Sequence, residues 1–191
     1  MIYNTIEELA KYLESYNLPY RHLVATSGGF DPIHIGHLRC IQQSKQSLHD
    51  ILVVIVNGDG FLTRKKGKPF MPLAERMEII DGLRGVDFVT TWDDGSQNVI
   101  GALEILKPHL FAKGGDRSSA DKVPEAEVCA KIGCTILYGV GGTDKVQSSS
   151  NLIKNSKEDK IKYLDPNCEH NWVLDGHNAG EGICSKCLKR E

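Results

Sequence analysis

The sequence predicts an α/β fold, a parallel sheet with helices on both faces, followed by a small metal-binding module. Five short apolar runs of β type alternate with helical patterns between Leu23 and Lys154. Such alternation is typical of parallel strands joined by right-handed crossover helices. Three of the six cysteines fall within residues 168–191, a segment with too few large apolar side chains to form a core of its own.

Length and composition indicate an ordinary globular protein of 191 residues, 40% hydrophobic and 25% charged. No apolar run approaches the roughly 20 residues that a membrane-spanning helix needs. Residues 1–16 lack a basic segment followed by an apolar one, so a cytoplasmic location without a membrane partner is expected. The net charge of −2 gives no general attraction to nucleic acid, so any phosphate binding must be local.

The chain is expected to divide into four segments. Residues 1–21 contain a packing helix, and residues 22–154 form the main domain. Residues 155–166 are polar and end on a proline, which is typical of a linker, and residues 167–191 form the small module. The first helix should begin at Thr5, which has capping-box spacing to Glu8.

The main domain should alternate strands and helices, with ligands at the carboxyl ends of the strands. The predicted strands are Leu23–Thr26, Ile51–Val56, Phe88–Thr91, Leu110–Ala112 and Thr135–Tyr138. The predicted helices are His37–Leu48, Pro72–Leu83, Gln97–Leu106, Pro124–Ile132 and Ser149–Lys154.

A glycine-rich segment, SGGFDPIHIGHL at residues 27–38, connects the first strand to the next helix. Gly28 and Gly29 permit a tight turn with close backbone approach. His34 and His37 follow at the helix entrance, with Gly36 between them. Two imidazoles, free backbone N–H groups and the positive end of the helix together predict an anion site that suits a triphosphate.

This segment resembles the His-x-Gly-His signature of the cytidylyltransferase-like nucleotidyltransferases, which have a Rossmann-like sheet. The nearest patterns are those of heptose 1-phosphate adenylyltransferases and glycerol 3-phosphate cytidylyltransferases. The resemblance covers roughly residues 23–154. Further matches follow in the same order: Lys66 in RKKGKP, Arg76 in PLAERMEII, Lys113 to Asp116 in AKGGD, and Ser148 to Ser150 in VQSSSNLIK.

The resemblance implies an enzyme that joins the α-phosphate of ATP or CTP to a phosphorylated sugar or polyol and releases pyrophosphate. The acceptor phosphate is already ionised near neutral pH, so no general base is needed, and catalysis consists of positioning and charge stabilisation. His34 and His37 are assigned to the α- and β-phosphates, and Lys66 to the acceptor phosphate or the α-phosphate. Arg76 should position a phosphate or the loop that carries Lys66.

The resemblance also implies a set of nucleotide-binding residues and a Mg²⁺ ion that bridges triphosphate oxygens. The serine run and the following helix should hold the β- and γ-phosphates, and the KGGD stretch should contact the nucleotide or the acceptor. The full set is Gly28, Gly29, Phe30, Asp31, Gly36, Lys113, Gly114, Gly115, Asp116, Ser148, Ser149 and Ser150.

Each of these assignments has a purely structural alternative. The two histidines could structure a turn, the lysines around Lys66 could form a solvated loop, and the serine run could cap a helix. Arg76 could form only a structural ion pair. Asp31 could approach the acceptor or cap its own turn, and Asp59 is similarly ambiguous.

The carboxyl-terminal segment has the ligand spacing of a structural Zn²⁺ site. Cys168-x-His170 and Cys184-x-x-Cys187 are two close pairs separated by thirteen residues, which suits a tetrahedral ion in a zinc-ribbon-like module. His177 is an alternative ligand to His170, and exposed thiols without metal are the structural alternative. The acidic balance of this segment argues against a nucleic-acid partner. Docking on the main domain or on a second copy, as a homodimer, is expected instead.

Two other functions remain open. GGFDPIHIGH is also similar to nicotinate or nicotinamide mononucleotide adenylyltransferases, and the serine run to pantetheine-phosphate adenylyltransferases, so a cofactor precursor is an alternative acceptor. A different class is a non-catalytic nucleotide-binding regulator that is tethered through its zinc module.

Overall fold

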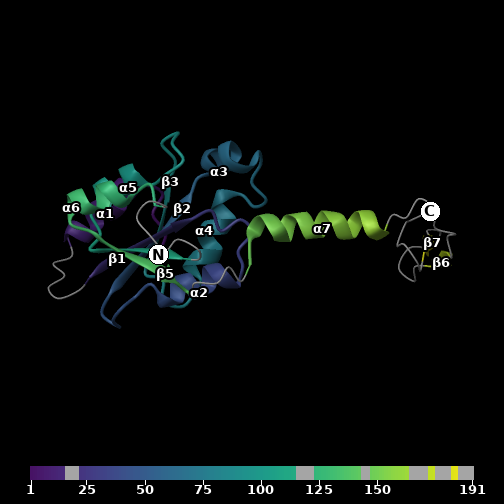
Figure 1. The fold of residues 1–191 in the computed structure, drawn as a ribbon, viewed down its shortest axis with the longest axis horizontal. Coiled ribbons are helices and arrows are strands. Elements are labelled where there is room, and N and C mark those ends of the chain that lie inside the picture. Colours follow the sequence, from purple (N-terminus) through teal and green to yellow (C-terminus); the bar gives the residue numbers. More distant parts are fainter. Residues whose placement is uncertain (16–21, 115–122, 143–146, 164–171, 175–181, 185–191) are drawn as a thin grey trace. The chain divides into compact units, whose positions relative to one another are not determined.

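The computed structural model describes residues 1–15, 22–114, 123–142, 147–163, 172–174 and 182–184. It divides the chain into two compact units, Met1–Ser149 and Ser150–Glu191. The first unit contains a five-stranded parallel sheet, ordered β3-β2-β1-β4-β5 (Figure 1). The strands are β1 Leu23–Gly28, β2 Ile51–Asn57, β3 Phe88–Trp92, β4 Leu110–Gly114 and β5 Thr135–Val140. Its helices are α1 Ile6–Ser15, α2 Ile35–Gln43, α3 Asp59–Lys66, α4 Leu73–Asp81, α5 Ile100–Leu106 and α6 Ala126–Ile132. Helix α7, Ser149–Tyr163, begins at the last residue of the first unit and otherwise belongs to the second.

The predicted fold class is confirmed, and all five predicted strands are present. Each begins at its predicted residue and continues one or two residues further. The extra residues still pair with their neighbours, as Gly28 does with Val56 and Gly114 with Val140. These extensions carry the strand ends to the edge of the sheet where ligands are expected.

The strand order creates a switch point between β1 and β4. From β1 the chain moves outward to β2 and β3, and it then returns to place β4 on the other side of β1. In open α/β sheets the crevice at such a point, outside the carboxyl ends of the strands, is the usual ligand site.

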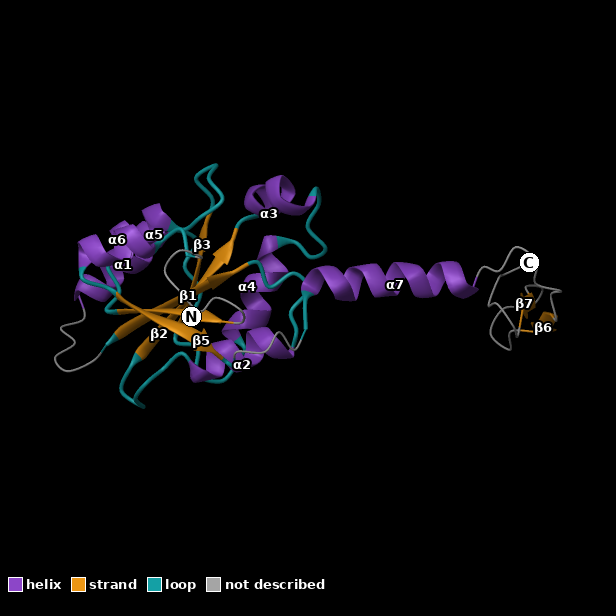
Figure 2. Ribbon diagram, in the orientation of Figure 1, coloured by secondary structure: helices purple, strands orange, loops and turns teal. Residues whose placement is uncertain are grey.

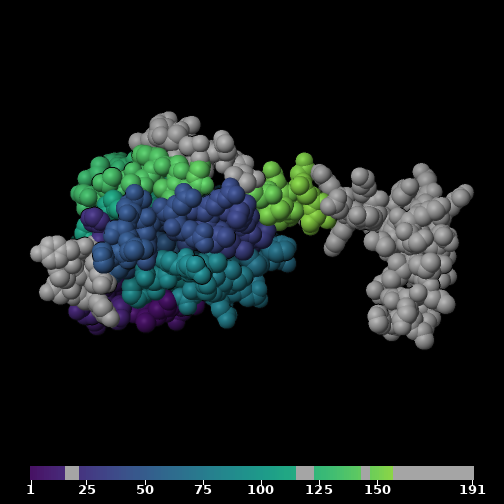
Figure 3. Space-filling model, turned by 90° about the horizontal axis from the view of Figure 1, so that it is seen from below, coloured from purple at the N-terminus to yellow at the C-terminus, as the bar shows by residue number. Residues whose placement is uncertain are grey.

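Helices cover both faces of the sheet (Figure 2). Alternate residues of β2 belong to the two different cores on these faces. Val53 and Ile55 belong to the core with α1, α5 and α6. Leu52 and Val54 belong to the core with α2 and α4. Figure 3 shows the second layer at the surface, with residues around α2 in blue and those around α4 in teal. All seven residues of β2 are buried, as expected for a strand covered on both sides.

The amino-terminal helix agrees with its predicted cap. The backbone N–H of Glu8 donates to Thr5 Oγ1 at 3.2 Å, and Ile6, Leu9 and Leu13 are buried in the core. The side chains that share one face of the sequence pattern are therefore the ones that pack against the sheet.

Three helical segments differ from the prediction. Helix α3 occupies a stretch that was expected to be a loop, so Lys66 ends a helix. Helix α2 stops at Gln43 because the Asp50 carboxylate accepts the N–H groups of Gln46 and Ser47 and forms a turn there. Helix α7 continues through residues 155–163 of the expected linker, whose lysines and glutamate are good helix formers.

The second unit contains an antiparallel pair of short strands, β6 Trp172–Leu174 and β7 Gly182–Cys184. Of the predicted zinc ligands, Cys184 ends β7, whereas Cys168, His170 and Cys187 lie outside the described residues. The zinc module therefore stays a prediction. Among the described helices, none is both long and apolar enough to cross a membrane.

Candidate active site

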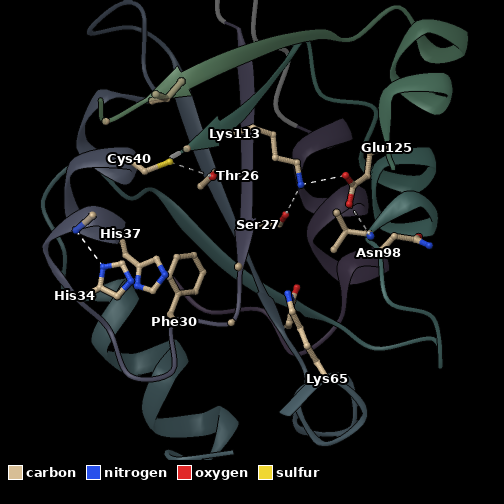
Figure 4. A pocket seen from close by; sticks show the side chains of 18 of the residues that line it. Thr26, Ser27, Phe30, His34, His37, Cys40, Lys65, Asn98, Lys113 and Glu125 are labelled. Carbon is tan, nitrogen blue, oxygen red and sulfur yellow. Dashed lines mark hydrogen bonds and ion pairs between the residues drawn. The ribbon is translucent and has the colours of Figure 1, made fainter. Parts of the chain in front are cut away.

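A cavity of about 390 Å³ opens at the switch point of the sheet (Figure 4). Its walls come from the ends of β1, β4 and β5, the first turns of α2, the helix α3, and the loop before α5. Of the segments that the sequence analysis singled out, the histidine segment and the first two residues of the KGGD stretch thus meet around one hollow.

His34 is the N-cap residue of α2, and its Nδ1 accepts the backbone N–H of Gly36 at 3.1 Å. Because Nδ1 is the acceptor, the neutral ring carries its proton on Nε2 and can donate from that side. A Cβ at Gly36 would lie 3.1 Å from two atoms of the His34 ring. The glycine of the motif therefore allows His34 to fold back over the helix end.

His37 stacks on His34, with ring centroids 3.7 Å apart and planes inclined by 19°. The Phe30 ring packs against His37 edge to face, with the two ring centroids 5.1 Å apart. Burial, together with the nearby His34 and Lys66, lowers the pKa of His37 to about 3, and burial and Lys66 also lower the pKa of His34. Both rings are neutral at pH 7. His37 Nδ1 is buried with no hydrogen-bond partner among the described residues, an orphan that a ligand could satisfy.

Two lysines at the end of α3 have different environments. Lys65 lines the cavity, while Lys66 Nζ donates to the Asp31 carbonyl oxygen at 2.7 Å. The fully buried Asp31 carboxylate accepts the N–H groups of Phe70 at 2.9 Å and Met71 at 2.8 Å. Burial lowers the pKa of Lys66, and the nearby Lys65 and Arg76 lower it further against the opposing effect of Asp31. Through these contacts Asp31 connects its own loop to the end of α3 and to the segment at Phe70 and Met71.

Arg76 is fully buried and uses four of its N–H donors within the protein. Nη1 donates to Gly29 O and Asn57 O, both at 2.8 Å, Nε donates to Met71 O at 3.1 Å, and Nη2 donates to Asp59 Oδ1 at 2.6 Å. These acceptors lie on three segments around the cavity. The geometry favours the loop-positioning alternative for Arg76 over a phosphate contact.

Lys113 ends in the cavity, as expected for the KGGD stretch. Its Nζ lies 3.1 Å from Glu125 Oε2 and 3.5 Å from Ser27 Oγ. Gly114 also lines the cavity, whereas Gly115 and Asp116 lie outside the described residues.

The serine run begins α7. Ser149 is the last residue of the first unit, and its Oγ donates to Pro32 O in the histidine loop at 2.9 Å. The N–H of Ser148 donates to the side chain of Gln147, and Gln147 lines the cavity. Ser150 is the first residue of the second unit. Phosphate contacts from the serines stay a prediction.

Several cavity residues escaped the sequence analysis. Helix α3 has an acid in its first turn, basic residues in its last turn and a glycine at its end, which are helix signals, but eight residues give little periodicity. Gln97, Asn98 and Glu125 also line the cavity. Nothing in the local sequence distinguishes Glu125 from an ordinary acid before a helix.

Comparison with known proteins identifies the family. The model of a family described as cytidylyltransferase-like matches residues 25–157. The chain belongs to the cytidylyltransferase-like family. The predicted enzyme class, a nucleotidyltransferase, is thereby confirmed at the level of the family, and the match spans the sheet and the histidine motif.

Relatives within this family are bifunctional proteins. The bifunctional protein HldE of Hahella chejuensis is 34% identical over 166 residues, which are 83% of this chain but 32% of that protein. The bifunctional protein HldE of Shewanella sp. (strain ANA-3) is 38% identical over 136 residues, 70% of this chain and 28% of that protein. The chain thus spans about a third of the length of these relatives.

A solved structure shares the fold. Pantoate-β-alanine ligase from Francisella tularensis, crystallised with β,γ-ATP and β-alanine, matches with a TM-score of 0.53 and 17% identity. The match covers 87% of this chain and 77% of that one. At this identity the likeness supports the fold alone.

Proposed function

We propose that this chain transfers a nucleoside monophosphate from ATP or CTP to a phosphorylated sugar or polyol and releases pyrophosphate. The observation that carries the proposal is the stacked pair of neutral histidines at the start of α2, next to the cavity at the switch point. Each neutral imidazole carries one N–H group, which can donate a hydrogen bond to a phosphate oxygen.

The proposed reaction is an in-line displacement at the α-phosphorus. An oxygen of the acceptor phosphate forms the new P–O bond, and the bond to pyrophosphate breaks on the opposite side. His34 donates from Nε2, and the helix end adds backbone N–H groups and a partial positive charge. Lys65 from α3 offsets the repulsion between the two phosphorylated substrates, and Lys66 holds the loop beside it.

Mg²⁺ fits this site as an ion that arrives with the nucleotide. It usually binds substrate phosphates and keeps several waters, so it needs few protein ligands. Lysines and imidazoles suit phosphate oxygens, and the Glu125 carboxylate is already paired with Lys113. The ion would neutralise charge on the leaving pyrophosphate.

The sugar or polyol acceptor is supported by the order of motifs, which resembles heptose 1-phosphate adenylyltransferases, and by relatives named HldE. We also propose a structural Zn²⁺ ion held by Cys168, His170, Cys184 and Cys187, on the strength of their spacing. A cytoplasmic location and a role for the zinc module in docking, including on a second copy, belong to the same proposal.

A pyrophosphate-release assay tests the proposed function. The full chain with Mg²⁺ should release pyrophosphate from ATP or CTP only when a phosphorylated acceptor is present. The acceptor panel should contain hexose and heptose 1-phosphates, glycerol 3-phosphate, nicotinamide mononucleotide and phosphopantetheine. Release with the last two alone would favour the cofactor-precursor alternative, and nucleotide binding without release would favour a regulator.

A further inference from the structure

A buried ion pair forms one wall of the cavity. Lys113 and Glu125 retain only 7% and 3% of their accessible surface, and Nζ lies 3.1 Å from Oε2. Figure 4 shows the pair on the opposite side of the cavity from His34 and His37. The phosphate end of the site and this charged pair are therefore separate features.

Each member of the pair is held in place by a second contact. Glu125 Oε1 accepts the backbone N–H of Val99 at 3.3 Å, which ties the start of α6 to the start of α5. Lys113 Nζ lies 4.4 Å from the centre of the Phe111 ring and 3.5 Å from Ser27 Oγ. Two charged heads are thus presented to the cavity in a fixed arrangement.

Fold stability alone is a poor explanation for this pair. A buried salt bridge commonly adds little stability, because removing both charges from water costs about as much as their attraction returns. Glu125 Oε2 has no hydrogen bond of good geometry among the described residues, although Lys113 lies close to it. That oxygen retains the capacity to accept a hydrogen bond from a ligand in the cavity.

The charges of the pair determine what it can bind. A carboxylate repels phosphate, so the triphosphate and the acceptor phosphate should lie toward the histidines and Lys65. The carboxylate can accept a hydrogen bond from a hydroxyl group, and the ammonium group can donate one to a neighbouring hydroxyl. Asn98, an uncharged polar residue, also lines the cavity.

We propose that Lys113 and Glu125 form a hydroxyl-recognition subsite, which binds adjacent hydroxyl groups of one substrate while the histidine end binds the phosphates. The inference rests on the proposed function in that it assumes two phosphorylated substrates meet in this cavity. The hydroxyls belong either to the ribose of the nucleotide or to the carbon chain of the acceptor. Glu125 is then a specificity-determining residue.

The experiment compares hydroxylated ligands with deoxy analogues by isothermal titration calorimetry on the full chain with Mg²⁺. One arm uses ATP and CTP against their 2′-deoxy and 3′-deoxy forms. The other arm uses mannose 1-phosphate against its monodeoxy forms. The variant is Glu125→Gln, whose amide oxygen can still accept the N–H of Val99. Glu104→Gln is the matched control, since Glu104 forms an exposed ion pair with Lys131.

Wild-type protein should prefer the hydroxylated ligand by about 10- to 100-fold in one arm, the range for a hydrogen bond to a charged group. Glu125→Gln should reduce this ratio to near one, and Glu104→Gln should keep it. The arm in which Glu125→Gln abolishes the preference for the hydroxylated ligand shows whether the subsite binds the nucleotide or the acceptor. If Glu125→Gln does not fold, the double variant Lys113→Met/Glu125→Gln removes both charges together and serves the same comparison.

A wild-type ratio near one in both arms would overturn the inference, as would an unchanged ratio in Glu125→Gln. Pyrophosphate release is scored separately on the wild-type chain. Pyrophosphate release by the wild-type chain, together with an affinity ratio that Glu125→Gln leaves unchanged, would rule out the hydroxyl subsite and keep the proposed function. A ratio that depends on Glu125 without pyrophosphate release keeps the subsite and removes the proposed function.

Discussion

Replacing Arg76 by methionine should destabilise the first unit severely, because the guanidinium supports three segments at once. Three carbonyl oxygens, the buried one of Asn57 and the part-buried ones of Gly29 and Met71, would lose a charged donor. The partner carboxylate of Asp59 is 45% exposed and regains water, so it contributes little. At about 1 kcal/mol or more for each carbonyl, the free energy of unfolding should fall by about 3–5 kcal/mol.

Urea denaturation followed by circular dichroism measures this loss, and a thermal melt should show a Tm lower by about 10 °C. Arg76→Lys should recover only part of the stability, since one ammonium group cannot reproduce the planar fork. Arg84→Met, at an exposed arginine just after α4, is the matched control and should change the free energy of unfolding by less than about 0.5 kcal/mol. A stable Arg76→Met protein with nucleotide affinity weakened at least tenfold would refute this reasoning, since Arg76 would then contact phosphate directly.

Three further results are expected. Lys65→Ala should weaken nucleotide or acceptor binding about tenfold, measured by calorimetry, without changing stability. Lys66→Ala should weaken binding and also lower the free energy of unfolding in urea titration, and Lys68→Ala should do neither. Equal losses of affinity and stability in all three variants would indicate a diffuse electrostatic effect of the basic residues. The pKa of His37 is lowered from 6.5 to about 3 by folding, so the stability gained from keeping it neutral is present above pH 6.5 and is lost as the pH falls toward 3. Urea titrations at pH 7 and 4.5 should therefore show a larger loss for wild type than for His37→Gln, and equal losses would contradict the assigned burial. Elemental analysis should find one zinc per chain and its loss in Cys184→Ser, whereas zinc-free protein purified without chelator would argue against the module.

The sheet was predictable because its strands are short, apolar and regularly spaced. A continuous apolar run such as that of β2 is typical of a strand that is buried on both faces. The placement of the histidine motif at a helix entrance was predictable because His34, Gly36 and His37 are close in sequence and lie within one helix turn. Glu125 was not predictable, since it precedes a helix and its pairing depends on Lys113 from the distant strand β4. The role of Arg76 was left open for the same reason, because its acceptors are main-chain oxygens that no sequence pattern marks.

The central claim is that the histidine pair stabilises charge on a transferred phosphate, and turnover of His37→Ala tests it most directly. With nucleotide and acceptor both saturating, pyrophosphate release should fall by about 10² or more, the cost of removing a preorganised donor. Circular dichroism should show the fold intact, and His49→Ala, at an exposed histidine, should keep wild-type turnover. Near-normal pyrophosphate release by folded His37→Ala would contradict the account.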